Sequence, residues 1–116
     1  MEIKIIKDPI SKKELIDMAK EQFGDLIKAV VDIDQGIMAV GGEMHADEEA
    51  ILMEKETSRR ESTWGINIYP GKNKEEMIEF DSVINLKPSF GNRSRSVDNP
   101  EIQNKIRNIV EKLISQ

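Results

Sequence analysis

The sequence predicts an α+β fold in which an antiparallel β-meander of about five strands carries an N-terminal and a C-terminal helix packed on one face. Two observations predict this class. Apolar and polar residues alternate in residues 63–69 and again in residues 77–87, and the turn-forming segment 70–74 separates them, which is typical of a β-hairpin. In residues 11–23 and 100–113 the apolar residues instead recur about every three to four positions, which is typical of helices with one buried face.

Composition limits the classes of function. The chain of 116 residues has no cysteine and one histidine, which excludes disulfide frameworks, cysteine-based zinc sites and sites built on several histidines. Its net charge of −5 at pH 7 disfavours nucleic acid as a partner. No apolar run approaches the ~18 residues of a membrane helix, and the N-terminus lacks a signal-peptide pattern. We therefore expect a single domain over residues 1–116 with a cytoplasmic location and no membrane partner.

The N-terminal helix has a clear start and stop in the sequence. Residues 3–6 predict a short strand before it. The Ser11 hydroxyl can accept a hydrogen bond from the Glu14 amide, and the Glu14 carboxylate can reach back, as in a capping box. Gly24 supplies a left-handed stop after the last apolar residue. We therefore expect a helix over residues 11–23 that covers the sheet.

Two strands follow, and then a segment with two interpretations. Alternation predicts strands over residues 26–33 and from residue 37 onward, joined by a turn. In residues 46–55, three acidic residues suit the first turn of a helix, whereas Ala50-Ile51-Leu52-Met53 is an apolar run of the kind found in buried strands. Because no long helical stripe accompanies the acidic residues, we predict a strand over residues 50–54.

The hairpin of residues 63–87 presents one apolar and one polar face. Trp64 is predicted to be core because it is in phase with two isoleucines, and Leu86 of the second strand is predicted to point inward. The polar face carries Asn67, Asp81 and Asn85. These three are either residues of a binding site or solvent-exposed positions of a one-sided sheet.

The C-terminal part of the chain predicts an irregular loop followed by a helix. Residues 89–96 are too rich in turn formers to be regular. Asn99 is the predicted N-cap, and Pro100 suits the first helical position. The apolar stripe that follows predicts that this helix also packs on the sheet.

Four short motifs give the chain a resemblance to a known family. They are Gly41-Gly42-Glu43-Met44-His45-Ala46-Asp47, Trp64-Gly65-Ile66-Asn67, Glu79-Phe80-Asp81-Ser82 and Gly91-Asn92-Arg93-Ser94-Arg95. With these motifs the chain resembles, over nearly its whole length, a family of small prokaryotic proteins catalogued as a domain of unknown function. The resemblance implies no activity, so the functional hypotheses rest on the chemistry of the residues.

The segment from Glu43 to Asp47 is a candidate metal site. If it continues as a strand, Glu43, His45 and Asp47 project from one face, and two carboxylates with an imidazole suit zinc, manganese or iron. A metal-bound water can then act as a nucleophile. The other interpretation is that His45 ends a strand and Asp47 is a solvated turn or cap residue. A lone motif of this kind often occurs without metal, so we expect no cofactor, with one divalent metal as the alternative.

The segment from Gly91 to Arg95 is a candidate anion site. Asn92, Arg93 and Arg95 precede the last helix, and guanidinium and amide donors near a helix N-terminus are groups that bind phosphate or carboxylate. The other interpretation is that the two arginines pair with carboxylates such as Asp81 and fix the loop to the sheet.

Two functional hypotheses follow. The first is a non-enzymatic binding or regulatory module that holds an anionic small molecule or a protein partner through the arginine loop, with the three polar hairpin residues as further ligand-binding candidates. The second is a metal-dependent hydrolase, such as a phosphoesterase, that uses the metal site and clamps its substrate with the arginines. A short distance between His45 and Arg93 in the fold would join the two candidate sites.

Overall fold

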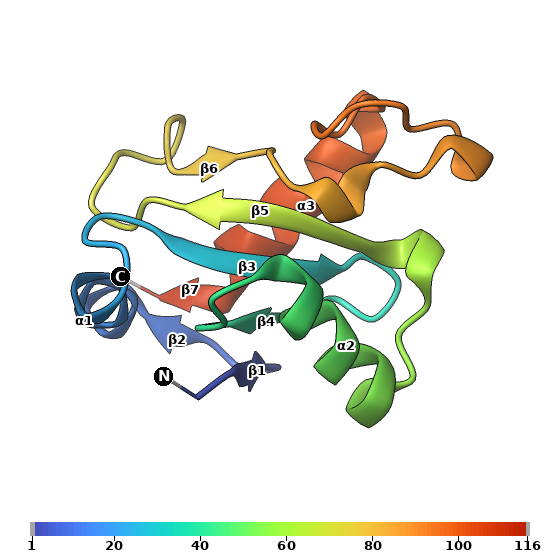
Figure 1. Ribbon diagram of the computed structural model, residues 1–116. Helices are drawn as coiled ribbons and strands as arrows, with labels where there is room; N and C mark the ends of the chain where they lie inside the picture. The colour runs from blue at the N-terminus through green and yellow to red at the C-terminus, as the bar shows by residue number, and fades with distance from the viewer. Residues whose placement is uncertain (1, 116) are drawn as a thin grey trace.

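A five-stranded antiparallel sheet forms the centre of the computed structural model, which describes residues 2–115 (Figure 1). Its strands are β1 (Lys4–Ile6), β3 (Ile27–Asp32), β4 (Ile37–Val40), β5 (Thr63–Ile68) and β6 (Ile78–Glu79). Two further strands, β2 (Ile10–Ser11) and β7 (Ile114–Ser115), pair in parallel and join the start of the first helix to the end of the last.

Three helices and three short 3₁₀ turns connect the strands. The helices are α1 (Lys12–Glu21), α2 (His45–Glu56) and α3 (Pro100–Leu113). The 3₁₀ turns are η1 (Arg60–Ser62), η2 (Val83–Asn85) and η3 (Pro88–Phe90). Within residues 2–115, none of the helices has both the length and the apolar character needed to span a lipid bilayer. The combination of sheet and helices confirms the predicted α+β class.

The strands β3 and β5 form the middle of the sheet. The strand order is β1-β4-β3-β5-β6, and each neighbouring pair is antiparallel. The predicted hairpin of β3 and β4 places Ala29 opposite Val40, and Ala29 also lies opposite Ile66 of β5. The order departs from a consecutive meander in two ways: β1 lies beside β4, and β3 rather than β4 lies beside β5.

Helices cover both faces of the sheet. As predicted, α1 and α3 share one face, where Leu15 and Ile106 join a core that includes Trp64, which is 2% exposed. The helix α2 packs on the opposite face, where Leu52 is fully buried with Val30 (Figure 1). The polar face of the hairpin is therefore partly covered, so its side chains are candidates for a site between α2 and the sheet.

Local signals set the ends of α1 and α3 as predicted. The Ser11 hydroxyl accepts a hydrogen bond from the Glu14 N–H at 3.1 Å, and Gly24 follows α1 in the left-handed conformation with φ of 95°. The second half of the predicted capping box does not form, because the Glu14 carboxylate accepts from Lys4 Nζ at 2.8 Å instead of reaching back to Ser11. The Asn99 side chain accepts a hydrogen bond from a first-turn N–H of α3 at 2.8 Å, and Pro100 is the first helical residue.

The predicted strand over residues 50–54 is wrong, because these residues lie inside α2. Asp47 and Glu48 occupy the first turn, where carboxylates face the positive end of the helix dipole. The buried residues of α2 are Glu48 and Leu52. The apolar stripe is weak because one of these buried positions holds a glutamate, and this is why the periodicity did not reveal the helix.

The second strand of the hairpin is shorter than predicted. β6 ends at Glu79, and the η2 turn follows within the segment expected to be strand. The Ser82 hydroxyl accepts a hydrogen bond from the Ile84 N–H at 3.3 Å and caps this turn. Leu86, predicted to point inward, is 39% exposed. The prediction fails because a serine hydroxyl that bonds the local backbone competes with the strand ladder.

Candidate functional site

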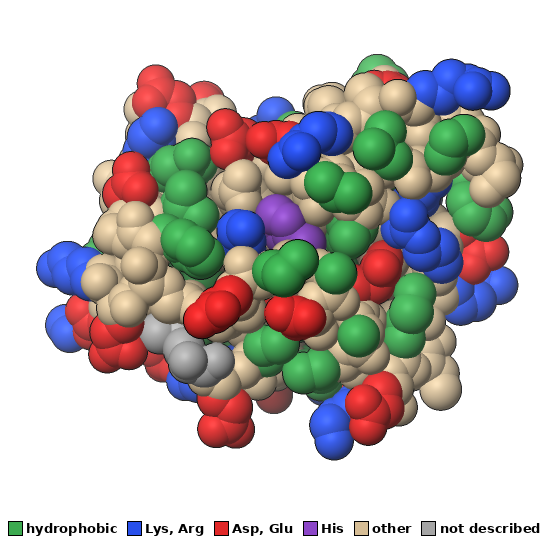
Figure 2. Space-filling model, viewed as in Figure 1, with side chains coloured by type: hydrophobic (Ala, Val, Ile, Leu, Met, Phe, Trp, Pro, Cys, Tyr) green, Lys and Arg blue, Asp and Glu red, His purple; other side chains and the backbone are tan. Residues whose placement is uncertain are grey.

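An open cavity of about 440 Å³ lies between the start of α2, the strands β3 and β5, and the segment after β6. We call it the His45 cavity. Figure 2 shows the one histidine of the chain in a hollow near the middle of this face. The polar residues that line the cavity are Lys28, His45, Asn67, Asp81, Ser82 and Arg95. Its volume is in the range of sites that bind small molecules.

The imidazole of His45 is fixed by the backbone of the sheet. His45 is the first residue of α2, and its Nε2 lies 2.8 Å from the Ile66 carbonyl oxygen, to which it donates. Burial lowers the pKa of His45, and the charge of Lys28 acts in the same direction. The side chain is therefore neutral at pH 7, with its proton on Nε2 and Nδ1 left as an acceptor.

The N-terminus of α2 opens onto the cavity without a side-chain cap. Met44 is the N-cap residue, and its side chain accepts no hydrogen bond from the first turn. The first N–H groups that bond within the helix are those of Asp47 and Glu48, which donate to the Met44 carbonyl oxygen. The N–H groups of His45 and Ala46 therefore have no partner within the helix, and both residues line the cavity. This end of the helix carries a partial positive charge that favours anions.

Two cationic side chains reach the same cavity from different elements. Lys28 comes from β3, and Arg95 comes from the loop that precedes α3. Arg95 Nε donates to Asp81 Oδ1 at 2.8 Å, and the two side chains are 56% and 48% exposed. Because this pair uses only Nε, the Nη groups of the guanidinium retain their donors for a ligand. Among the side chains that line the cavity, these two cations face one carboxylate, that of Asp81, so the lining itself is cationic.

Asn67 forms part of the floor of the cavity and has an unsatisfied acceptor. Its side chain is 9% exposed, and its Nδ2 donates to Glu79 Oε1 at 2.8 Å, which sets the orientation of the amide. Asn67 lies near enough to His45 to raise the pKa of the imidazole. Its Oδ1 is nevertheless buried and has no hydrogen-bond partner within residues 2–115.

The structure brings together some of the predicted site residues and separates others. His45, Asn67, Asp81 and Arg95 all line the His45 cavity, although they come from four separate segments. Arg93 does not: its side chain is exposed, and its N–H donates to Asp98. Of the two arginines of the predicted anion site, Arg95 therefore shares a cavity with His45 of the predicted metal site, and Arg93 does not.

Asn85 and Asn92 hold the arginine loop in place. The Asn85 amide bonds both the N–H and the carbonyl of Gly65, at 2.8 and 2.9 Å, and also the carbonyl of Arg95 at 2.9 Å. Asn92 is 4% exposed, and its Nδ2 donates to three carbonyl oxygens, including that of Asn85 at 2.8 Å. Their bonds are all to the backbone, so these two residues position Arg95.

The three predicted metal ligands do not share a face. Glu43 lies in a bend before α2, His45 begins the helix, and Asp47 is an exposed first-turn residue. The part of the chain from 2 to 115 contains no group of three histidine, aspartate or glutamate side chains that could hold a metal ion. The strand geometry assumed for residues 43–47 is wrong, because β4 ends at Val40.

Sequence reasoning missed Lys28 and the open N-terminus of α2. Lys28 is one polar position in an alternating strand, and nothing in its sequence context distinguishes it from a solvated lysine. The helix end was missed because residues 46–55 gave no clear helical stripe. A capped start would have been visible, whereas Met44 at the N-cap position gives no signal.

The fold and the cavity define a class of small α+β proteins with a ligand-sized site between a sheet and a helix N-terminus. Residues 4–113 match the family described as protein of unknown function DUF5674, and the chain belongs to this family. The match confirms the resemblance to a family of unknown function. No curated protein and no solved structure matches the chain.

Proposed function

We propose that the protein is a binding or regulatory module that holds a small anionic molecule in the His45 cavity. The observation that carries the proposal is the convergence of two cations, Lys28 and Arg95, and the uncapped N-terminus of α2 on one ligand-sized cavity. Such an arrangement stabilises a phosphate or carboxylate through charge-assisted hydrogen bonds.

Each group has a distinct role in the bound complex. The Nη groups of Arg95 and the Nζ of Lys28 donate to the anion, and the N–H groups of His45 and Ala46 bond its remaining oxygen atoms. Asp81 keeps the Arg95 guanidinium at the mouth of the cavity through the bond at 2.8 Å.

The test is the dependence of thermal stability on the anion. Phosphate and sulfate are expected to raise the melting temperature above that in chloride at matched ionic strength, because a ligand that binds only the folded state stabilises it by mass action. A phosphate concentration of ten times Kd stabilises the fold by about 1.4 kcal/mol. Arg95→Gln and Lys28→Gln should each remove most of this increment.

Arg93→Gln is the matched control. Arg93 lies in the same loop and is exposed, but it does not line the cavity, so its replacement should leave the phosphate increment intact. Without phosphate, Arg95→Gln should cost less than about 1 kcal/mol, because its pair with Asp81 is about half exposed. Equal stability in phosphate and chloride, or an equal effect of the Arg93 and Arg95 variants, would contradict the proposal.

A further inference from the structure

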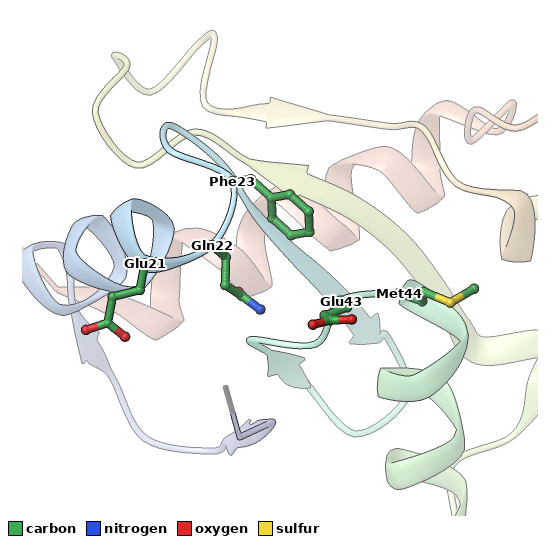
Figure 3. A pocket seen from close by; sticks show the side chains of 5 residues that line it. All are labelled: Glu21, Gln22, Phe23, Glu43 and Met44. Atoms are coloured by element: carbon green, nitrogen blue, oxygen red, sulfur yellow. The ribbon is translucent and has the colours of Figure 1, made fainter.

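A second cavity adjoins the His45 cavity and shares a wall with it. This cavity of about 550 Å³, which we call the Phe23 cavity, is lined by Glu21, Gln22, Phe23, Glu43 and Met44. Figure 3 shows that these side chains come from the end of α1 and from the segment that leads into α2. Met44 lines both cavities, and the Nζ of Lys28 lies 5.2 Å from the centre of the Phe23 ring. The cationic end of the first cavity therefore borders the aromatic wall of the second.

Large apolar side chains are exposed along this border. Met44 is 58% exposed, Phe23 is 43% exposed, and Val83 on the opposite side of the His45 cavity is 61% exposed. Exposed apolar side chains beside a polar cavity mark a site for a ligand that has both polar and apolar parts. Inorganic phosphate would leave these three side chains in water.

We propose that the ligand is an amphipathic anion with one charged head group and an apolar chain. This inference rests on the proposed function, which places the head group in the His45 cavity beside Lys28 and Arg95. The chain runs past Met44 and covers the face of Phe23 in the neighbouring cavity. The ligand is thus of the class of small alkyl carboxylates or alkyl phosphates that are free in solution.

The charges of the Phe23 cavity exclude a second anionic group. Glu21 and Glu43 line this cavity and are exposed, so a carboxylate at the far end of the chain meets like charges. A monoanion should therefore bind better than a dianion of the same length. The head group therefore lies beside the cations of the His45 cavity, and the uncharged chain lies beside the carboxylates of the Phe23 cavity.

Sodium acetate, butyrate, hexanoate and adipate are suitable probes, observed through the backbone amide resonances of His45 and Ala46. Complete burial of one methylene group tightens binding about fourfold, so hexanoate is expected to bind at least about tenfold tighter than acetate. Adipate, which has six carbon atoms and two carboxylates, is expected to bind more weakly than hexanoate.

The matched variants are Phe23→Ser and Phe90→Ser. Both phenylalanines are exposed, but Phe90 lies in η3 and lines neither cavity. Phe23→Ser should reduce the advantage of hexanoate over acetate at least threefold. Phe90→Ser should leave this ratio unchanged.

Four results would contradict the inference, and they differ in which part of it they refute. Equal affinities of acetate and hexanoate would refute the apolar chain while the anion site remains. Adipate binding as tightly as hexanoate would refute the exclusion of a second anionic group from the Phe23 cavity. Equal losses in the two serine variants would refute the role of Phe23. If neither phosphate nor any carboxylate shifts the amide resonances of His45 and Ala46, the proposed function fails and the inference fails with it.

Discussion

Replacement of Glu48 by glutamine is expected to stabilise the fold at neutral pH. Glu48 is fully buried on α2, where its Oε2 accepts a hydrogen bond from the Gly42 N–H at 2.9 Å and its Oε1 has no partner within residues 2–115. Burial raises the pKa of this carboxyl group from 4.5 to about 9, although the Gly42 N–H acts in the opposite direction. The folded protein therefore keeps the Glu48 proton at pH 7.

The size of the effect follows from the difference in proton binding between the folded and unfolded states. The unfolded chain releases the Glu48 proton above pH 4.5, so folding at pH 7 must take it up again. At about 1.36 kcal/mol for each of the 2.5 pH units between 4.5 and 7, this costs about 3 kcal/mol. The contribution of protonated Glu48 to the free energy of unfolding is fully present below pH 4.5 and falls as the pH rises toward 9. Glutamine keeps the shape and does not titrate, so Glu48→Gln should gain about 3 kcal/mol at pH 7 and little at pH 5.

Urea unfolding between pH 5 and pH 7.5 measures this difference. The range ends below the pKa of Lys87, which burial lowers to about 8, so that Lys87 does not contribute a second titration. Glu54→Gln is the control, because Glu54 is exposed on the same helix and should show the pH dependence of the wild type. A wild-type free energy of unfolding that is equal at pH 5 and pH 7.5, or a gain in Glu48→Gln that does not grow with pH, would refute the reasoning.

Three further predictions concern other positions. Gly65→Ala should lower the free energy of unfolding in urea by about 2 kcal/mol, because the new Cβ would lie 2.6 Å from Ser82 Cβ; an unchanged value would show that Ser82 can move aside. In the Glu48→Gln background the free energy of unfolding should rise between pH 8 and pH 10, because Lys87 is charged in the unfolded chain and neutral in the folded one. Lys87→Met should abolish this rise, and a rise that persists would place the titration elsewhere. Elemental analysis of the purified protein should give less than one zinc or manganese per chain; one metal per chain that is lost in His45→Ala would support the metal-dependent hydrolase.

The elements with local signals were predictable from the sequence. The start of α1 at Ser11, its stop at Gly24 and the start of α3 at Asn99 depend on hydrogen bonds and backbone angles within a few residues, so a short stretch of sequence contains the whole cause. The alternation in β3 and β5 likewise indicated strands, although nearly every residue of both is buried because helices cover both faces of the sheet. These signals were sufficient for the fold class and for the placement of α1 and α3 on one face.

The helix α2 and the site depended on tertiary structure. Glu48 occupies a buried position of α2 because the segment after β4 supplies the Gly42 N–H, a contact that no helical periodicity can indicate. The sequence singled out His45 and Arg95 as candidates, but as members of two different sites. They line one cavity because α2 crosses the sheet where Asn85 fixes the loop of Arg95 to β5. Contacts between segments so far apart in the chain are decided by the packing of the sheet and its helices, and a single sequence carries no local signal for them.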